Sequence, residues 1–166
     1  MIGGFVNKVV EIDLANEKIH IDLLNLEMAR KYIGGKGIAT KILWDKLKPN
    51  VDPFGPDNIL IFATGPLTGT LCPATRMVVV TKSPLTGTFT DSYVGGRFGH
   101  ELKFAGYDLI VISGKAEKPV LLWIADESVW ISDARHLWGK DTFETDKLIV
   151  LPLKDVGITA SIILFL

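Results

Sequence analysis

The chain has 166 residues, of which 48% are hydrophobic and 22% charged, so it can bury a core and is not a disordered chain. Its formal net charge of −1 argues against a nucleic-acid-binding protein, because such proteins need a basic excess to displace counterions from phosphates. The single cysteine, Cys72, excludes an internal disulfide framework and a cysteine-rich zinc or iron–sulfur site within this chain.

The start of the chain carries no recognisable targeting signal. Residues 1–8 lack the charged segment and the long apolar run of a signal peptide. No apolar run reaches about 18 residues, the length that indicates a membrane span. We therefore expect a cytoplasmic protein without a membrane partner.

The first half of the chain is predicted to form a hairpin, two helices and three further strands. Asn25 is the expected N-cap of the first helix, and Pro49 is expected to stop the second. The predicted strands cover residues 5–14, 18–23, 59–63, 76–81 and 88–93, and the predicted helices cover residues 26–32 and 38–47.

The second half is predicted to contain two helices and three strands. One helix opens after Gly95-Gly96 and runs to Phe104, with Gly106 as its C-terminal cap. The strands are expected at residues 109–112, 119–124 and 129–131, and the last helix from residue 141 or 142 to residue 148. Strands grouped around a few helices indicate an α+β fold with two mainly antiparallel β-sheets.

Two features bear on the domain organisation. Residues 33–37 (IGGKG) and 94–99 (VGGRFG) each precede a predicted helix, which suggests a possible internal duplication. Residues 1–148 are expected to form one domain, and residues 149–166 a divergent apolar segment. An exposed apolar ending favours aggregation unless it is paired, so this segment indicates either an interface or a chain cut from a longer protein.

The pentapeptide PLTGT occurs twice, at residues 66–70 and 84–88, with Arg76 and an apolar strand between the copies. Proline and glycine make each copy a structured turn. A guanidinium offers a planar set of donors that suits a phosphate or a carboxylate. Arg76 is therefore a candidate anion-binding residue, the alternative being an arginine that is merely solvated at the end of a strand.

The Gly95-Gly96 loop is a second candidate, because glycines let backbone N–H groups approach an oxyanion. Its spacing differs from the dinucleotide-binding fingerprint, and residues 34–37 lack the spacing of a phosphate-binding P-loop. Tight packing alone is an equally good interpretation of both loops. Together the candidates suggest binding elements for an anionic group.

Other titratable residues predict no catalytic set and no metal site. The three histidines are scattered and have no metal-ligand spacing, so a structural or solvated role is favoured for His20, His100 and His136. Asp91 and Glu101 lie near the glycine loop, where capping or solvation is favoured over ligand contact.

Five segments together resemble the N-terminal domain of the tungsten-containing aldehyde ferredoxin oxidoreductases. The resemblance covers residues 3–148. The segments are 58–70 (NILIFATGPLTGT), 76–87 (RMVVVTKSPLTG), 99–108 (GHELKFAGYD), 114–119 (GKAEKP) and 136–139 (HLWG). Each segment alone is weak, but the series is highly specific.

The resemblance implies a domain of two β-sheets that forms the base for a bis-pterin tungsten cofactor, or tungstopterin. It further implies that Arg76 contacts the pterin, and that Tyr93, Gly95 and Gly96 lie against the cofactor near its phosphates and their bridging Mg²⁺. The family often has Asn-Ser-Gly-Gly where this chain has Tyr93-Val94-Gly95-Gly96. A main-chain contact tolerates Tyr93, whereas a side-chain contact would be lost or replaced.

The family's full enzymes oxidise aldehydes to carboxylic acids and pass electrons through a 4Fe-4S cluster to ferredoxin. The cluster cysteines lie in later domains that this chain does not carry. We therefore expect a truncated or standalone cofactor-binding domain that cannot oxidise aldehydes alone. The alternative is a structural or assembly module that self-associates, or docks on partner domains, through the former cofactor face.

Overall fold

The computed structural model describes residues 3–126, 128–153 and 161–165. A six-stranded sheet has the strand order β2-β1-β6-β3-β4-β5, and all its neighbours are antiparallel except the parallel pair β1 and β6. Its strands are β1 (Lys8–Asp13), β2 (Lys18–Leu23), β3 (Ile59–Thr64), β4 (Met77–Lys82), β5 (Phe89–Val94) and β6 (Leu109–Ser113).

A smaller antiparallel sheet has the order β8-β7-β9. Its strands are β7 (Val120–Ala125), β8 (Ser128–Asp133) and β9 (Ser161–Phe165). The helices of the described residues are α1 (Leu26–Tyr32), α2 (Lys36–Lys46), α3 (Phe98–Phe104), the short 3-10 helix η1 (Arg135–Leu137) and α4 (Thr142–Leu153). None of these helices has the length and apolar character needed to cross a membrane.

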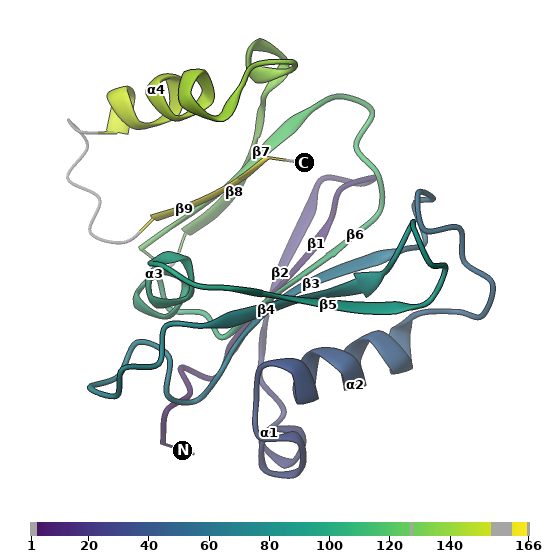
Figure 1. Ribbon diagram of the computed structural model, residues 1–166, viewed down its shortest axis with the longest axis vertical. Helices are drawn as coiled ribbons and strands as arrows, with labels where there is room; N and C mark the ends of the chain where they lie inside the picture. The colour runs from purple at the N-terminus through teal and green to yellow at the C-terminus, as the bar shows by residue number, and fades with distance from the viewer. Residues whose placement is uncertain (1–2, 127, 154–160, 166) are drawn as a thin grey trace.

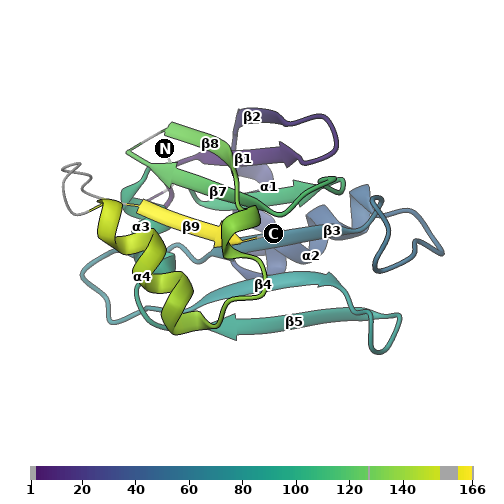
Figure 2. The ribbon, with the colours of Figure 1, turned by 90° about the horizontal axis from the view of Figure 1, so that it is seen from above.

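The layers stack on the two faces of the six-stranded sheet (Figure 1). α1 and α2 cover one face, where Ile38, Ile42 and Ile61 join one apolar cluster. α3 and the smaller sheet cover the other face, where Leu102 and Ile110 join a second cluster. Figure 2 shows the smaller sheet and α4 above the larger sheet, with β5 at the edge of the molecule.

The central strands are apolar on both sides because both faces of the sheet are covered. β6 is buried at Leu109, Ile110, Val111 and Ile112, and these residues alternate between the two clusters. A strand with both faces covered is expected to be a continuous apolar run rather than an alternating one. The edge strands β2 and β5 have mostly exposed or half-buried residues.

The predicted α+β fold class with two mainly antiparallel sheets is confirmed. Asn25 is the N-cap of α1, since its Oδ1 accepts hydrogen bonds from the N–H groups of Glu27 (2.9 Å) and Met28 (3.0 Å). Several boundaries differ from the predictions. Arg76 lies just before β4 rather than in it, and α4 continues to Leu153 rather than ending at residue 148.

The predicted internal duplication and the predicted boundary at residue 148 remain predictions. The two glycine loops do each precede a helix, but α2 and α3 lie on opposite faces of the larger sheet. Part of the predicted apolar ending, residues 154–160 and 166, lies outside the described residues. β9, at residues 161–165, pairs with β7.

Candidate functional site

The two PLTGT copies lie at opposite ends of β4. The first belongs to the connection between β3 and β4, and the second forms the turn between β4 and β5. In the second copy the N–H of Gly87 donates to the carbonyl of Ser83 (2.9 Å), which closes the hairpin. The prediction that the copies flank a strand is therefore confirmed. The strand separates them, so they do not form one joint surface.

The register of β4 and β5 brings the predicted cofactor-binding residues together. Met77 is opposite Val94, and Val78 is opposite Tyr93. Continued by one residue, this register places Arg76 beside Gly95. Arg76, Tyr93, Gly95 and Gly96 thus lie at one end of the β4–β5 hairpin, the end far from the second PLTGT turn. We call these four residues the hairpin-end site.

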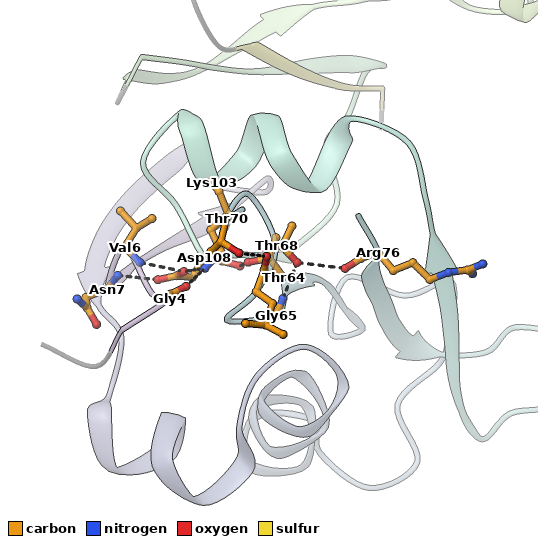
Figure 3. A network of polar contacts seen from close by, with 11 residues as sticks. Gly4, Val6, Asn7, Thr64, Gly65, Thr68, Thr70, Arg76, Lys103 and Asp108 are labelled. Carbon is orange, nitrogen blue, oxygen red and sulfur yellow. Dashed lines mark hydrogen bonds and ion pairs between the residues drawn. The ribbon is translucent and has the colours of Figure 1, made fainter. Parts of the chain in front are cut away.

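Arg76 is exposed, and its guanidinium forms no ion pair within the described part of the chain. Figure 3 shows its side chain pointing away from the buried polar groups while its carbonyl oxygen points toward them. A free guanidinium at a strand end can donate several hydrogen bonds to an anion.

The Gly95-Gly96 loop leaves space for a ligand. A Cβ atom built on either glycine has no heavy atom within 4 Å, and Gly96 has φ +78°, which glycine adopts without strain. Both residues are exposed. The loop therefore presents open main chain next to Arg76, with nothing in the described residues filling the space.

A second cation contacts the same hairpin from α2. Lys36 is the first residue of α2, and its Nζ is 2.9 Å from Oδ1 of Asp91 on β5. The ammonium also lies 5.7 Å from the centroid of the Phe89 ring. The hydrogen bond to Asp91 raises the pKa of Lys36 above its usual 10.5, so this lysine is protonated at neutral pH.

The remaining predicted candidates have local partners. Asp91 pairs with Lys36, and Glu101 lies 3.3 Å from the guanidinium of Arg97. Nε2 of His100 is 3.2 Å from the carbonyl oxygen of Ala74. The other two histidines lie on β2 and in η1, far apart in the chain. Within the described ranges, no three His, Cys, Asp or Glu residues are arranged to hold a metal ion.

Sequence patterns missed two contributors to this region. The Lys36–Asp91 pair joins residues that are 55 positions apart, so no local pattern predicts it. Thr68, inside the first PLTGT, is only 3% exposed, although the identical Thr86 is exposed. The repeat itself was visible in the sequence, but the different burial of its two copies was not.

A family model described as the N-terminal domain of aldehyde ferredoxin oxidoreductase matches residues 9–163. The chain belongs to this family. The predicted resemblance is confirmed, and the match includes all four residues of the hairpin-end site.

Larger oxidoreductases share much of the sequence. The chain is 48% identical to the tungsten-containing aldehyde ferredoxin oxidoreductase of Pyrococcus furiosus, over 95% of this chain and 26% of that protein. It is 40% identical to the WOR-like subunit of an aliphatic sulfonate oxidoreductase from the same organism, over 89% of this chain and 24% of that subunit. The aldehyde ferredoxin oxidoreductase domain described here therefore spans about a quarter of the length of these relatives.

A solved structure shares the fold of this aldehyde ferredoxin oxidoreductase domain. It is the active site complex BamBC of benzoyl coenzyme A reductase, in complex with 1,5-dienoyl-CoA. The TM-score is 0.88 at 41% identity, and the match covers 95% of this chain and 24% of that chain.

Proposed function

We propose that the hairpin-end site binds the anionic, phosphate-bearing part of a tungstopterin cofactor. One observation carries this proposal: Arg76, whose guanidinium forms no ion pair within the described residues, lies at the same end of the β4–β5 hairpin as the open Gly95-Gly96 main chain. The tungsten-containing relatives support the choice of tungsten as the metal of this cofactor.

The residues present fit such a group. A phosphate needs several donors and a close approach to main chain, and it can receive both from Arg76 and from Gly95-Gly96. Any Cβ at residues 95 and 96 would occupy space that is now open. We propose that Tyr93 contributes main chain rather than its side chain, and that Mg²⁺ associated with the cofactor phosphates lies near residues 93–96. Mg²⁺ prefers oxygen ligands, which main chain and phosphate both provide.

In a complete enzyme, the bound tungsten centre would accept electrons from an aldehyde, and ferredoxin would be their final acceptor. This chain's own part is to bind and orient the cofactor from one side. Its only cysteine is Cys72, so 4Fe-4S ligands must come from residues outside this sequence. We therefore propose that the chain alone is not catalytically competent. We further propose that residues 1–148 form its cofactor-binding unit and that the protein acts in the cytoplasm.

Anion binding tests the proposal directly. Inorganic pyrophosphate with Mg²⁺ serves as the probe, and ³¹P NMR titration measures the dissociation constant. Arg76→Ala is expected to weaken binding at least tenfold, because it removes a charge-assisted contact. Arg30→Ala, which removes an exposed arginine of α1, is the matched control and should bind as the wild type does. Equal affinity of both variants would contradict the site.

Metal content tests the proposed lack of competence. The purified chain should contain neither stoichiometric tungsten nor iron and should not reduce a dye when aldehyde is added. Elemental analysis that finds both metals, together with aldehyde-dependent dye reduction, would show that the chain is an enzyme by itself.

A second candidate function is an assembly module, and the exposed apolar residues of edge strand β5 favour it. Tyr93 is 53% exposed and Val94 37% exposed, beside the hairpin-end site. An unpaired edge with apolar side chains favours pairing with another chain. We propose that this edge contacts a second copy of the chain or partner domains when no cofactor is bound.

A further inference from the structure

Thr68 lies beneath the hairpin-end site, inside the first PLTGT copy. Its side chain is 3% exposed and points toward the main chain that leads into β4. The Thr68 hydroxyl donates to the carbonyl of Arg76 (3.3 Å) and accepts from the N–H of Gly65 (3.3 Å). One hydroxyl therefore joins the end of β3 to the residue that carries the guanidinium (Figure 3).

The methyl group of Thr68 faces the other half of the site. A Cβ built on Gly99 would lie 3.2 Å from Cγ2 of Thr68, so α3 approaches this methyl closely. Gly99 follows the Gly95-Gly96 loop by a few residues and lies in the first turn of α3. The two branches of one side chain thus contact the segments that present Arg76 and the glycine loop.

The second PLTGT copy contains the same threonine in a different setting. Thr86 is exposed, and its hydroxyl is 2.9 Å from that of Thr88 within the same turn. There the Ser83 hydroxyl accepts from the turn's N–H groups, at 3.2 and 3.3 Å. Among the described residues, Thr86 forms no hydrogen bond with Arg76 or α3, and it lies at the opposite end of β4.

We infer that Thr68 is a positioning residue for the anion site. Its hydroxyl holds the main chain of Arg76. Its methyl packs against Gly99 and thereby fixes how far the glycine loop lies from Arg76. This inference rests on the proposed function of Arg76. A strand-end arginine loses side-chain entropy when it binds an anion, so a fixed main chain lowers the remaining cost of ordering.

The test compares isosteric changes in the two copies. Thr68→Val keeps the shape but removes the hydroxyl, Thr68→Ser keeps the hydroxyl, and Thr86→Val is the matched control in an identical pentapeptide. The probe is again Mg²⁺–pyrophosphate, titrated well below the unfolding temperature of each variant. Thr68→Val should raise the dissociation constant about threefold to tenfold, the factor that corresponds to the loss of one neutral hydrogen bond. Thr68→Ser should largely restore the affinity, and Thr86→Val should leave it unchanged.

The number of sites separates positioning from a merely structural role. A structural loss would lower the melting temperature or the number of sites per chain while the dissociation constant stays that of the wild type, and this outcome would overturn the inference. Arg76→Ala separates the two proposals. If Arg76→Ala loses binding but Thr68→Val does not, only the role of Thr68 is wrong. If Arg76→Ala binds normally, or the wild-type chain binds no pyrophosphate at millimolar concentration, the proposed function fails and the inference with it.

Discussion

Lys103 and Asp108 form an ion pair whose side chains are 5% and 0% exposed. The Asp108 carboxylate also accepts from the N–H groups of Val6 (3.1 Å) and Asn7 (2.6 Å), and Nζ of Lys103 donates to the carbonyl of Gly4 (2.7 Å). Buried charges are tolerated when they are paired and hydrogen-bonded. The pair therefore ties the N-terminal segment to α3, the helix that follows the glycine loop.

Breaking this pair should strongly destabilise the domain. Asp108→Asn keeps the shape of the side chain but leaves the Lys103 ammonium buried without its counter-charge, which costs about 3–5 kcal/mol. Urea unfolding followed by circular dichroism measures the loss. Arg135→Met, which removes an exposed ion pair with Asp133, is the control and should change stability far less. Equal losses in both variants would contradict the structural role of the buried pair.

Gly37 should resist replacement by alanine although it lies in a helix. Helix propensity alone predicts that Gly37→Ala stabilises α2 by about 1 kcal/mol. The Cβ, however, would lie 2.2 Å from the carbonyl oxygen of Tyr32 in the preceding helix. We expect a net loss of about 1–3 kcal/mol, the usual cost of overpacking, measured by urea unfolding.

Gly95→Ala is the matched control for that change. A Cβ at Gly95 would lie in open space, and the residue has no left-handed φ. The free energy of unfolding of Gly95→Ala should therefore stay within about 0.5 kcal/mol of the wild type. A Gly37→Ala variant as stable as Gly95→Ala would show that α1 and α2 move apart at little cost.

Local signals in the sequence predicted most of the elements. Gly106 is predicted to follow the C-terminal end of α3 as its C′ residue. The helix ends at Phe104, Ala105 is its C-cap, and Gly106 comes next with φ +95°. The segment 109–112 predicted the strand β6, and Asn25 predicted the start of α1. These features depend on residues that are close together in the chain, so single-sequence patterns contain them.

The site depends on contacts that are distant in the chain. Thr68 and Thr86 have identical neighbours in sequence, yet only Thr68 is buried, because α3 packs against it through Gly99. Arg76 comes beside Gly95 only through the register of β4 and β5. The resemblance to the family pointed to these residues, but no local pattern predicts how they are held.

The stabilisation from the Lys36–Asp91 pair should be lost only at high pH. Because the folded-state pKa of Lys36 is raised above its ordinary 10.5, its contribution is fully present below that value and is lost as the pH rises through the folded pKa. The melting-temperature difference between the wild type and Lys36→Met should therefore be constant between about pH 6 and pH 9 and shrink above 10.5. Lys48→Met, which removes an exposed lysine beyond α2, controls for the loss of one charge. A difference that already falls near neutral pH would contradict this account.

A lysine on the β5 edge should prevent self-association of the chain. β5 is an edge strand of the larger sheet (Figure 2). Val94 is its last residue and is 37% exposed. A charged side chain on an edge strand opposes pairing with a second strand. Light scattering across a dilution series should show that the wild type associates and that Val94→Lys stays monomeric at the same concentrations. Val6→Lys is the matched control, because Val6 is also 37% exposed but lies in the N-terminal segment before β1. A wild type that is monomeric at every concentration would rule out self-association, and equal association of all three proteins would place the contact away from β5.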